Sequence, residues 1–267
     1  MTAQTRSEIS QLLARHGVAP SHRLGQHFLA DANITRKIVE LAGVGPGVQV
    51  VEIGAGTGTL TRALAATGAH VVAYEVDPGL LPVLEEVTQG LPVELRFLDA
   101  TAVDLTVDLP GEGWVMVSNL PYNVGTPLLL DALRRATQIS RFVVMIQREV
   151  AERLVAGPGS RLYGLPSVIA GIHGRADLSF RVAPQVFYPA PKVESAVVVI
   201  RRLPAPDEAD RAIEIASAAF NQRRKMLRRS LAGIFDDPAS ALHSAGIDPT
   251  ARAEQLSPGD YLRLARS

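Results

Sequence analysis

The chain has 267 residues, of which 47% are hydrophobic and 20% charged, so it has the composition of a globular protein rather than a disordered or fibrous one. It has no cysteine, which excludes disulfide bonds, thiolate metal sites and a catalytic thiol, and fits a cytoplasmic location. Its 27 basic and 27 acidic side chains give a net charge of zero, so the whole molecule is not a general polyanion binder. No apolar run approaches the roughly 20 residues that cross a bilayer, and we expect no membrane segment.

The first 22 residues are predicted to form an N-terminal arm. Ile9, Leu12 and Leu13 have the spacing of one face of a short helix, and an irregular connection over residues 17–22 follows them. Because termini without further anchors are often poorly ordered, we expect the arm to be partly mobile.

From residue 49 onward, apolar runs of strand length alternate with helical stretches. The runs are nearly continuously apolar and are bounded by Gly, Pro, Asp or Asn, as in parallel strands that helices cover on both faces. They are residues 49–53, 70–75, 93–98, 114–118 and 142–147, with a last strand expected at 196–201. This alternation predicts an α/β fold with a doubly wound sheet.

After Leu203 the composition changes through a short proline-rich stretch to helical sequence without strand signals. We therefore expect three parts: the arm over residues 1–22, an α/β domain over 23–203, and a small C-terminal helical domain over 204–267.

A glycine-rich loop follows the first predicted strand of the sheet. Gly54, Gly56 and Gly58 alternate with small residues, and Glu52 precedes the first glycine by two positions. Glycines permit a tight turn and the close approach of a ligand to a helix N-terminus. The spacing differs from the G-x-G-x-x-G pattern of dinucleotide-binding folds. It resembles the S-adenosylmethionine loop of class I methyltransferases.

Acidic residues end the next two predicted strands. Glu75 is placed to accept both ribose hydroxyls of a nucleoside, and Asp99 to accept from an adenine amino group. Each residue taken singly can instead be a solvated strand end or a helix cap. Three successive strand ends with the expected groups favour the cofactor interpretation.

The fourth predicted strand ends in Asn119, Leu120, Pro121 and Tyr122. This sequence resembles the (Asn/Asp)-Pro-Pro-(Tyr/Phe) motif of enzymes that methylate exocyclic amino groups of bases. Such an amine is a poor nucleophile because its lone pair is delocalised into the ring. The Asn119 amide oxygen and the Leu120 carbonyl can accept its hydrogens, Pro121 stiffens the backbone, and Tyr122 offers a ring on which an extruded base can stack.

Together these motifs resemble the bacterial small-subunit rRNA adenine dimethyltransferases, which modify two adjacent adenosines in a hairpin loop near the 3′ end of 16S rRNA. The resemblance runs from Leu24 to the C-terminus. Its motifs are residues 24–29 (LGQHFL), 51–58 (VEIGAGTG), 119–129 (NLPYNVGTPLL), 147–158 (QREVAERLVAGP), 186–197 (VFYPAPKVESAV), 219–231 (AFNQRRKMLRRSL) and 252–257 (RAEQLS).

The resemblance implies a class I methyltransferase domain with a Rossmann-like doubly wound sheet, followed by a small helical domain. It implies a cofactor site for S-adenosyl-L-methionine and no metal. The implied cofactor residues are His27, Leu29, Gly54, Gly56, Glu75, Asp99 and Asn119. Asn119, Leu120, Pro121, Tyr122 and Phe187 are the implied catalytic residues, with the rings of Tyr122 and Phe187 enclosing the target base.

Two positions differ from the pattern of that family. Gly125 stands where serine or threonine is usual, which removes a hydroxyl near the catalytic loop. Leu165 and Pro166 stand where arginine or another polar residue is expected, which affects an RNA or packing contact.

Five basic residues fall within residues 223–229 of an otherwise neutral chain. From Ile213 the apolar residues recur at helical spacing, and on one continuous helix Arg224 lies inside that apolar stripe. We therefore expect Arg224 at the domain interface, and RNA phosphates on Arg223, Lys225, Arg228 and Arg229. The simpler alternative is a solvated basic face.

The expected function is S-adenosylmethionine-dependent dimethylation of 16S rRNA within a precursor of the small ribosomal subunit, by a monomeric enzyme. One alternative is a 23S rRNA adenine dimethyltransferase that confers macrolide resistance, which would share the fold and the catalytic loop. Another is a ribosome-assembly or transcription factor that binds RNA without catalysis, against which the intact Gly54, Glu75, Asp99, Asn119 and Tyr122 argue. The glycine spacing disfavours a nicotinamide-dependent dehydrogenase.

Overall fold

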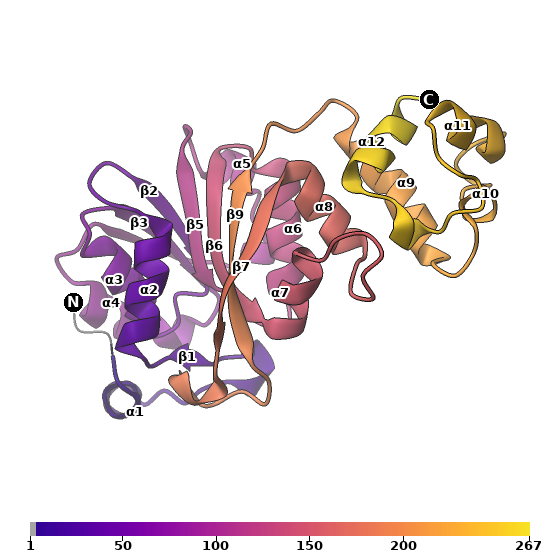
Figure 1. Ribbon diagram of the computed structural model, residues 1–267. Coiled ribbons are helices and arrows are strands. Elements are labelled where there is room, and N and C mark those ends of the chain that lie inside the picture. The colour runs from indigo at the N-terminus through magenta and orange to yellow at the C-terminus, as the bar shows by residue number, and fades with distance from the viewer. Residues whose placement is uncertain (1–3) are drawn as a thin grey trace. The chain divides into compact units, whose positions relative to one another are not determined.

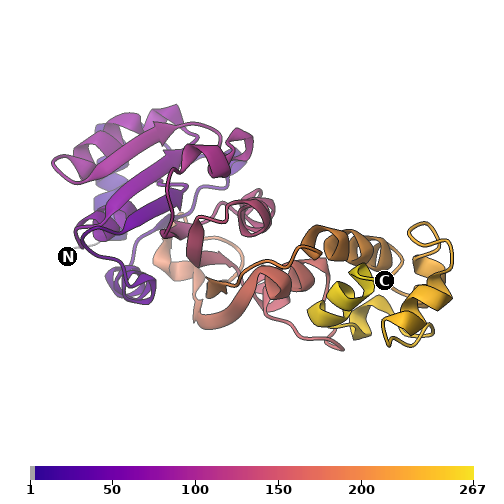
Figure 2. The same ribbon diagram turned by 90° about the horizontal axis from the view of Figure 1, so that it is seen from above.

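The computed structural model describes residues 4–267, which divide into two compact units (Figures 1 and 2). Unit 1 runs to Ala151 and resumes over Asp177–Arg201, and unit 2 comprises Glu152–Ala176 and Arg202–Ser267. The third and last point at which the chain passes between the units, after Arg201, lies close to the expected boundary after Leu203. Residues 152–176, which we assigned to the α/β domain, pack instead with the C-terminal helices.

Unit 1 is built on a seven-stranded sheet with the order β4-β3-β2-β5-β6-β9-β7. The strands from β2 to β6 are parallel, and β9 runs antiparallel to β6. The strands of this sheet are β2 (Gln49–Ile53), β3 (His70–Glu75), β4 (Val93–Phe97), β5 (Trp114–Asn119), β6 (Ile139–Gln147), β7 (Gly174–Val182) and β9 (Ser195–Arg202). The six strands predicted from the apolar runs are thus present, and β7 is an additional one.

Helices cover both faces of this sheet (Figure 1). The helices are α1 (Arg6–Arg15), α2 (Ala32–Ala42), α3 (Thr59–Ala65), α4 (Leu81–Thr88), α5 (Leu105–Asp108), α6 (Gly125–Arg135) and α7 (Arg148–Leu154). Val50, Val71, Val115 and Val143 share one hydrophobic core with residues of α1 to α4. Alternate strand residues point to the opposite face, where α6 packs on β6. Buried valines on both faces explain why the strands read as continuous apolar runs.

The order of the strands reverses between β2 and β5. In doubly wound sheets, ligands bind beyond the carboxyl ends of the strands at such a reversal. The glycine loop after β2 and the Asn119–Tyr122 loop after β5 flank it. A separate two-stranded ribbon pairs β1 (Phe28–Leu29) with β8 (Phe187–Tyr188).

The N-terminal arm is docked on unit 1. Thr5 caps α1 in a capping box with Glu8, and Ile9, Leu12 and Leu13 are buried, as the sequence predicted. At the C-terminal end of α1, Arg15 and His16 contact Glu86 of α4 at 2.5 and 2.7 Å. The expectation of partial mobility has no support in these contacts, and residues 1–3 of the predicted arm lie outside the described residues.

Unit 2 is helical, with a core of aromatic and small apolar side chains. Phe220 lies between Tyr163 and Tyr261, with ring centres 5.9 and 6.3 Å apart. The two tyrosine hydroxyls donate to the carbonyl oxygens of Leu256 and Ala253, each at 2.8 Å. Its helices are α8 (Leu165–His173), α9 (Ala209–Asn221), α10 (Leu227–Ser230), α11 (Pro238–Ser244) and α12 (Pro258–Ala265). Over residues 4–267, no helix is long and apolar enough to span a membrane.

The two departures from the family pattern have local explanations. Gly125 is buried at the start of α6, where an added Cβ would lie 2.7 Å from the Leu120 Cβ. A side chain at this position would require Leu120 to shift. Leu165 and Pro166 are the first two residues of α8, where a proline costs no hydrogen bond because the first helical N–H groups have no partner within the helix.

Candidate active site

The glycine loop leaves β2 in a conformation that glycine favours. Gly54 has φ +83° and its nitrogen donates to the Tyr74 carbonyl at 2.8 Å, while Gly56 has φ +57°. A Cβ on Gly56 would lie 2.9 Å from the Phe28 ring, and one on Gly54 would lie 3.3 Å from Pro121. The loop therefore has space for its neighbours and for a ligand only if these positions stay glycine.

Glu75, at the end of β3, binds this loop from one side. Its Oε2 accepts from the Gly56 nitrogen at 2.8 Å, and its Oε1 accepts from the nitrogens of Val76 and Asp77 at 2.9 and 3.0 Å. Burial raises the pKa of the Glu75 carboxyl, and these backbone N–H groups oppose the shift. Each carboxylate oxygen has two acceptor sites, so Oε1 is fully used and Oε2 keeps one site for a ribose hydroxyl.

Gln4, in the N-terminal arm, binds the loop from the other side. Its side chain is 5% exposed and makes three hydrogen bonds. The amide nitrogen donates to the Thr57 carbonyl at 3.1 Å, and the amide oxygen accepts from the hydroxyls of Thr57 and Thr59 at 2.9 and 2.7 Å. No sequence pattern predicted this contact, because Gln4 lies 53 positions from its partner in an arm without a motif.

Glu52 is a buried carboxylate beneath the same loop. It lines the pocket that also includes Glu75, Leu29 and Asn119, and it is 1% exposed. Among the described residues, its Oε2 has no hydrogen-bond partner. The pKa of Glu52 is raised to about 8, mainly because the carboxyl is buried and further because the charge of Glu75 is nearby. A buried acceptor without a partner at the wall of a pocket fits a cationic group of a ligand.

Asp99 lies in a second, adjoining slot. The slot is lined by Val76, Leu98, Asp99 and Pro121. Val76 and Leu98 are 45% and 51% exposed, which is unusual for large apolar side chains and suits two walls around a flat ring. Asp99 Oδ1 accepts from the nitrogen and hydroxyl of Thr101, which lowers the pKa of Asp99 and leaves Oδ2 for a ligand.

Asn119 ends β5 at the edge of the first pocket. Its amide nitrogen donates to the His27 carbonyl at 3.0 Å, so its amide oxygen is left as an acceptor. Leu120 follows, held by a hydrogen bond from its nitrogen to the Met145 carbonyl at 3.0 Å. Among the described residues, no hydrogen bond occupies the Leu120 carbonyl oxygen. Two adjacent acceptors are therefore available in one loop.

Tyr122 is held in place by its hydroxyl and its ring. The hydroxyl shares a hydrogen bond of 2.5 Å with the buried Ser195, and burial raises its pKa. The Tyr122 ring lies 5.5 Å from the His27 ring, tilted by 31°. His27 Nδ1 lies 2.8 Å from the Pro189 carbonyl, which can only accept, so Nδ1 carries a proton. Tyr122 is half-buried and borders the first pocket, where one face of its ring can receive a base.

Phe187 does not lie beside Tyr122 in an open site, as the sequence interpretation expected. It is fully buried in the hydrophobic core, in β8 opposite Leu29. A ring without exposed surface cannot stack on a base while the β1–β8 ribbon keeps this position. Leu29 does line the first pocket, together with His27, Gly54, Gly56 and Pro121. An aromatic residue before two prolines thus has a packing role that the motif alone did not reveal.

The basic segment of unit 2 differs from the predicted continuous helix. Helix α9 ends at Asn221, residues 222–226 form a turn, and α10 begins at Leu227. Helical spacing therefore does not extend across the segment. Arg223 donates from Nε to Glu254 at 2.6 Å and from Nη2 to the Arg161 carbonyl at 3.0 Å, whereas Arg224 is exposed. Arg223, expected to contact phosphate, is thus bonded within unit 2, and Arg224, expected at the domain interface, is exposed together with Lys225, Arg228 and Arg229.

Residues from five segments thus meet in two adjoining pockets of unit 1: the His27–Leu29 ribbon, the glycine loop, and the ends of β3, β4 and β5. In residues 4–267, no group of three or more His, Asp or Glu side chains is placed to hold a metal ion.

The chain is similar in sequence to known ribosomal RNA methyltransferases. A family model described as ribosomal RNA adenine dimethylase matches residues 20–267. Ribosomal RNA small subunit methyltransferase A of Leifsonia xyli subsp. xyli is 44% identical over 270 residues, covering 97% of this chain and 96% of the relative. The protein of the same name from Nocardia farcinica is 45% identical over 273 residues, covering 97% and 93%.

Solved structures confirm the predicted fold class. The 23S rRNA methyltransferase ErmE has a TM-score of 0.69 at 28% identity, covering 90% of this chain and 98% of its own. A dimethyladenosine transferase from Plasmodium falciparum has a TM-score of 0.76 at 22% identity, covering 89% and 96%. The match to the family model includes the glycine loop, both acidic strand ends and the Asn119–Tyr122 loop. The chain therefore belongs to the ribosomal RNA adenine dimethylase family, as its motifs predicted.

Proposed function

We propose that this protein uses S-adenosyl-L-methionine to dimethylate the exocyclic amines of two adjacent adenosines in the 3′-terminal hairpin loop of 16S rRNA. It acts as a monomer in the cytoplasm, on a precursor of the small ribosomal subunit. The observation that carries this proposal is the pair of free acceptors, Asn119 Oδ1 and the Leu120 carbonyl, beside a pocket suited to the cofactor. The names of the relatives support the choice of the small subunit.

The residues around the two pockets fit this cofactor from end to end. Glu52, buried and with an unpartnered oxygen, suits the ammonium group of the methionine part. Glu75 suits a ribose hydroxyl, and the slot between Val76 and Leu98 suits the adenine ring, with Asp99 Oδ2 accepting from its amino group. When bound, the cofactor supplies an electrophilic methyl group on a sulfonium.

The protein's contribution to the chemistry is to orient the target amine. Asn119 Oδ1 and the Leu120 carbonyl accept its hydrogens, which weakens conjugation with the ring and turns the nitrogen lone pair toward the methyl group. His27 fixes the Asn119 amide through its carbonyl, and Gly125 lets the loop approach α6 closely. These acceptors matter most as the nitrogen becomes pyramidal, so they lower the barrier more than they strengthen binding.

The target adenine stacks on Tyr122, whose ring is fixed by Ser195 and His27. Base stacking on an aromatic side chain contributes about 1 to 3 kcal/mol. A second aromatic surface from Phe187 requires the β1–β8 ribbon to shift, because the ring is fully buried. Tyr122 is therefore the main stacking residue.

Contacts with rRNA phosphates come from the exposed cations of the basic segment, Arg224, Lys225, Arg228 and Arg229. Arg223 holds the segment to the Arg161 loop instead. Phosphate contacts position an RNA without reading its sequence, so the choice of adenosines falls to the pocket at Tyr122.

The 23S rRNA alternative has less support. The relatives named small subunit methyltransferases are 44% and 45% identical to this chain, whereas the 23S rRNA enzyme ErmE is 28% identical. A role as an RNA-binding factor without catalysis leaves the two free acceptors and the unpartnered Glu52 oxygen without a purpose.

The deciding experiment incubates the protein with labelled S-adenosylmethionine and either unmethylated small subunits, large subunits or the corresponding naked rRNAs. We expect label in two adjacent adenosines of the 3′ hairpin loop of 16S rRNA, with small subunits as the best substrate. Label in 23S rRNA would favour the alternative enzyme. Cofactor binding without transfer to any of the four substrates would favour the non-catalytic factor.

A further inference from the structure

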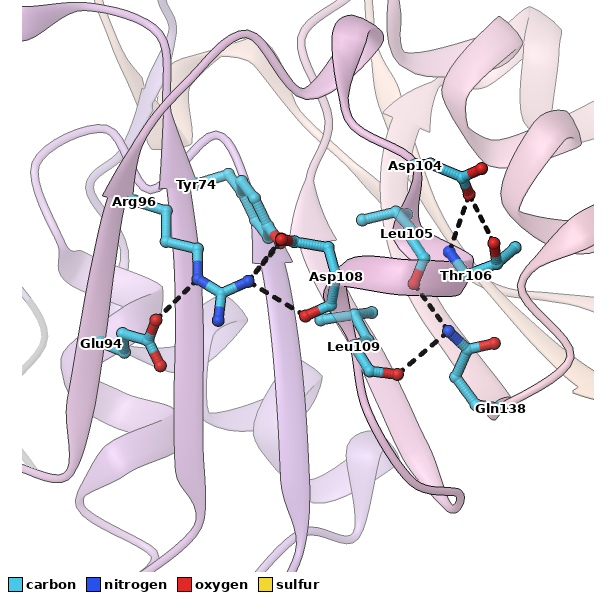
Figure 3. Close-up of polar contacts among 9 residues, drawn as sticks. All are labelled: Tyr74, Glu94, Arg96, Asp104, Leu105, Thr106, Asp108, Leu109 and Gln138. Carbon is cyan, nitrogen blue, oxygen red and sulfur yellow. Dashed lines mark hydrogen bonds and ion pairs between the residues drawn. The ribbon is translucent and has the colours of Figure 1, made fainter.

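Helix α5 is held to the sheet from two sides (Figure 3). On one side, Arg96 on β4 donates from Nη1 to the Asp108 side chain and, at 3.1 Å, to the Asp108 carbonyl. On the other, Gln138 Nε2 donates to the carbonyl oxygens of Leu105 at 2.6 Å and Leu109 at 3.2 Å. Because a helix of four residues has almost no stability of its own, its position depends on such contacts.

Tyr74 connects these contacts to the adenine slot. Its hydroxyl donates to the Asp108 side chain and accepts from Arg96 Nη1 at 3.0 Å (Figure 3). The Arg96 guanidinium also lies 5.6 Å from the centre of the Tyr74 ring. Tyr74 also lines the slot, together with Leu98 and Asp99. Tyr74 is 1% exposed, and burial raises its pKa further above neutrality, so its hydroxyl remains a donor.

The segment between the slot and α5 is shaped by its own turns. Asp99 caps the first turn through Thr101, and Asp104 caps α5 through the nitrogen and hydroxyl of Thr106. Such local bonds set the shape of a turn but do not fix where it lies relative to the sheet. Arg135 contacts Asp104 at 2.7 Å, but both side chains are about half exposed, and exposed ion pairs contribute little.

We propose that Tyr74, Arg96, Asp108 and Gln138 form a positioning network, here called the α5 clamp, that holds the Asp99 wall of the slot against the adenine ring of the cofactor. The inference deepens the proposed function and rests on it. The four side chains are positioning residues, since they act through α5 and the Asp99 segment rather than on the reacting atoms. The clamp therefore controls cofactor affinity and leaves the rate of methyl transfer at saturating cofactor unchanged.

The test uses Tyr74→Phe, which removes one hydroxyl and keeps the ring that lines the slot and packs in the core. We expect the dissociation constant of S-adenosylmethionine to rise about three- to tenfold, the size of the net contribution of one typical hydrogen bond. The same factor should appear for S-adenosylhomocysteine and for adenosine, because all three carry adenine. The kcat on small subunits at saturating cofactor should stay at the wild-type value.

Asp108→Asn is the second variant, since it keeps the shape of the side chain and weakens the bond to Arg96. The matched control is Glu94→Gln, which removes the 2.7 Å contact of Glu94 with Arg96 Nε on the exposed edge and leaves the Asp108 side of the guanidinium intact. We expect Asp108→Asn to resemble Tyr74→Phe and Glu94→Gln to resemble the wild type.

Three results would overturn the α5 clamp: unchanged cofactor affinity in folded Tyr74→Phe and Asp108→Asn, an equal loss in Glu94→Gln, or a fall in kcat that accompanies the loss of affinity. A wild-type protein that binds no S-adenosylmethionine would instead refute the proposed function. The two failures are therefore distinguishable in the same titrations.

Discussion

The glycine loop, called the cofactor loop below after its proposed role, and the basic segment both carry sequence motifs. They differ in how many hydrogen bonds fix their side chains and backbone. The cofactor loop is bonded from both sides, by Glu75 at 2.8 Å and by Gln4 through three hydrogen bonds. In the basic segment the Arg223 side chain is bonded to Glu254 and to the Arg161 carbonyl, whereas the side chains of Arg224 and Lys225 next to it are exposed. A cofactor that must present one methyl group needs a fixed site, whereas phosphate contacts tolerate flexible side chains.

This contrast predicts different consequences of mutation. Substitutions around the cofactor loop should change catalysis or cofactor affinity by large factors, because each group there has a defined bond. Substitutions in the basic segment should change RNA affinity gradually, in proportion to the number of charges removed.

The largest effect is expected for Asn119→Ala. The substitution removes an acceptor that is most needed as the amine becomes pyramidal, so single-turnover methylation of small subunits should slow by about 100- to 1000-fold. Affinities for the cofactor and for RNA should change little. Rapid-quench assays with labelled cofactor, together with calorimetry, measure the two quantities separately.

Asn123→Ala is the matched control, since Asn123 is an exposed amide in the same loop. It should keep the wild-type rate. If Asn119→Ala also methylates at a near-normal rate, Asn119 does not activate the amine and the loop serves only to bind.

The next largest effect is expected on the pH dependence of the free energy of unfolding, to which the buried Glu52 contributes. Its pKa in the folded protein is raised to about 8, above the value in the unfolded chain. The folded state therefore holds a proton that the unfolded state releases, and the free energy of unfolding should fall as the pH rises from about 4.5 to about 8. Glu52→Gln should flatten this slope, as measured by urea unfolding across that range.

Cofactor binding should respond to the same proton. If Glu52 pairs with the cofactor ammonium, binding favours the carboxylate, and wild-type affinity should rise between about pH 6 and 7, where the amine stays charged. Glu52→Gln should bind S-adenosylmethionine about tenfold more weakly, without this rise. A variant with wild-type affinity and the same pH dependence would place the ammonium elsewhere.

A smaller effect is expected for Gln4→Ala, which deletes three hydrogen bonds to the cofactor loop. Cofactor affinity should fall about three- to tenfold, because the loop loses its support on the side of the arm. Gln11→Ala is the control, as Gln11 bonds to Ser7 on the exposed side of α1. Equal affinities in the two variants would show that the arm is not part of the cofactor site.

Sequence patterns predicted the parallel strands and the position of their carboxyl ends well, for a physical reason. Parallel strands buried on both faces are read directly as apolar runs, and their carboxyl ends converge, so residues such as Glu75 and Asp99 could be placed without coordinates. Strand β7 alternates polar and apolar residues from Arg175 to Val182, as a half-buried strand at the edge of a sheet does. It was missed because the prediction relied on continuous apolar runs.

The sequence interpretation failed where contacts are non-local or where a helix ends without a strong signal. Gln4 and the buried Phe187 depend on partners far away in the chain. The end of α9 at Asn221 lacks the glycine or proline that marks many helix ends, so helical spacing was extended through the turn at 222–226. That extension placed Arg224 at the domain interface, whereas Arg224 is exposed and Arg223 is bonded to Glu254.

The smallest effect is expected in the basic segment, where Arg224 and Lys225 are exposed and Arg223 is bonded. Neutralising Arg224 and Lys225 together, with Arg224→Gln and Lys225→Gln, should weaken RNA binding and lower the log-log slope of affinity against salt by about 0.7 to 0.9 per lost contact. Arg223→Gln should leave the slope unchanged and instead lower the melting temperature, since its bonds to Glu254 and the Arg161 carbonyl join two parts of unit 2. Binding of small subunits across a salt series, with a thermal melt of each variant, distinguishes the two roles. A reduced slope in Arg223→Gln with an unchanged melting temperature would restore the phosphate contact first expected for Arg223, because it would mean that its charge serves RNA binding rather than the stability of unit 2.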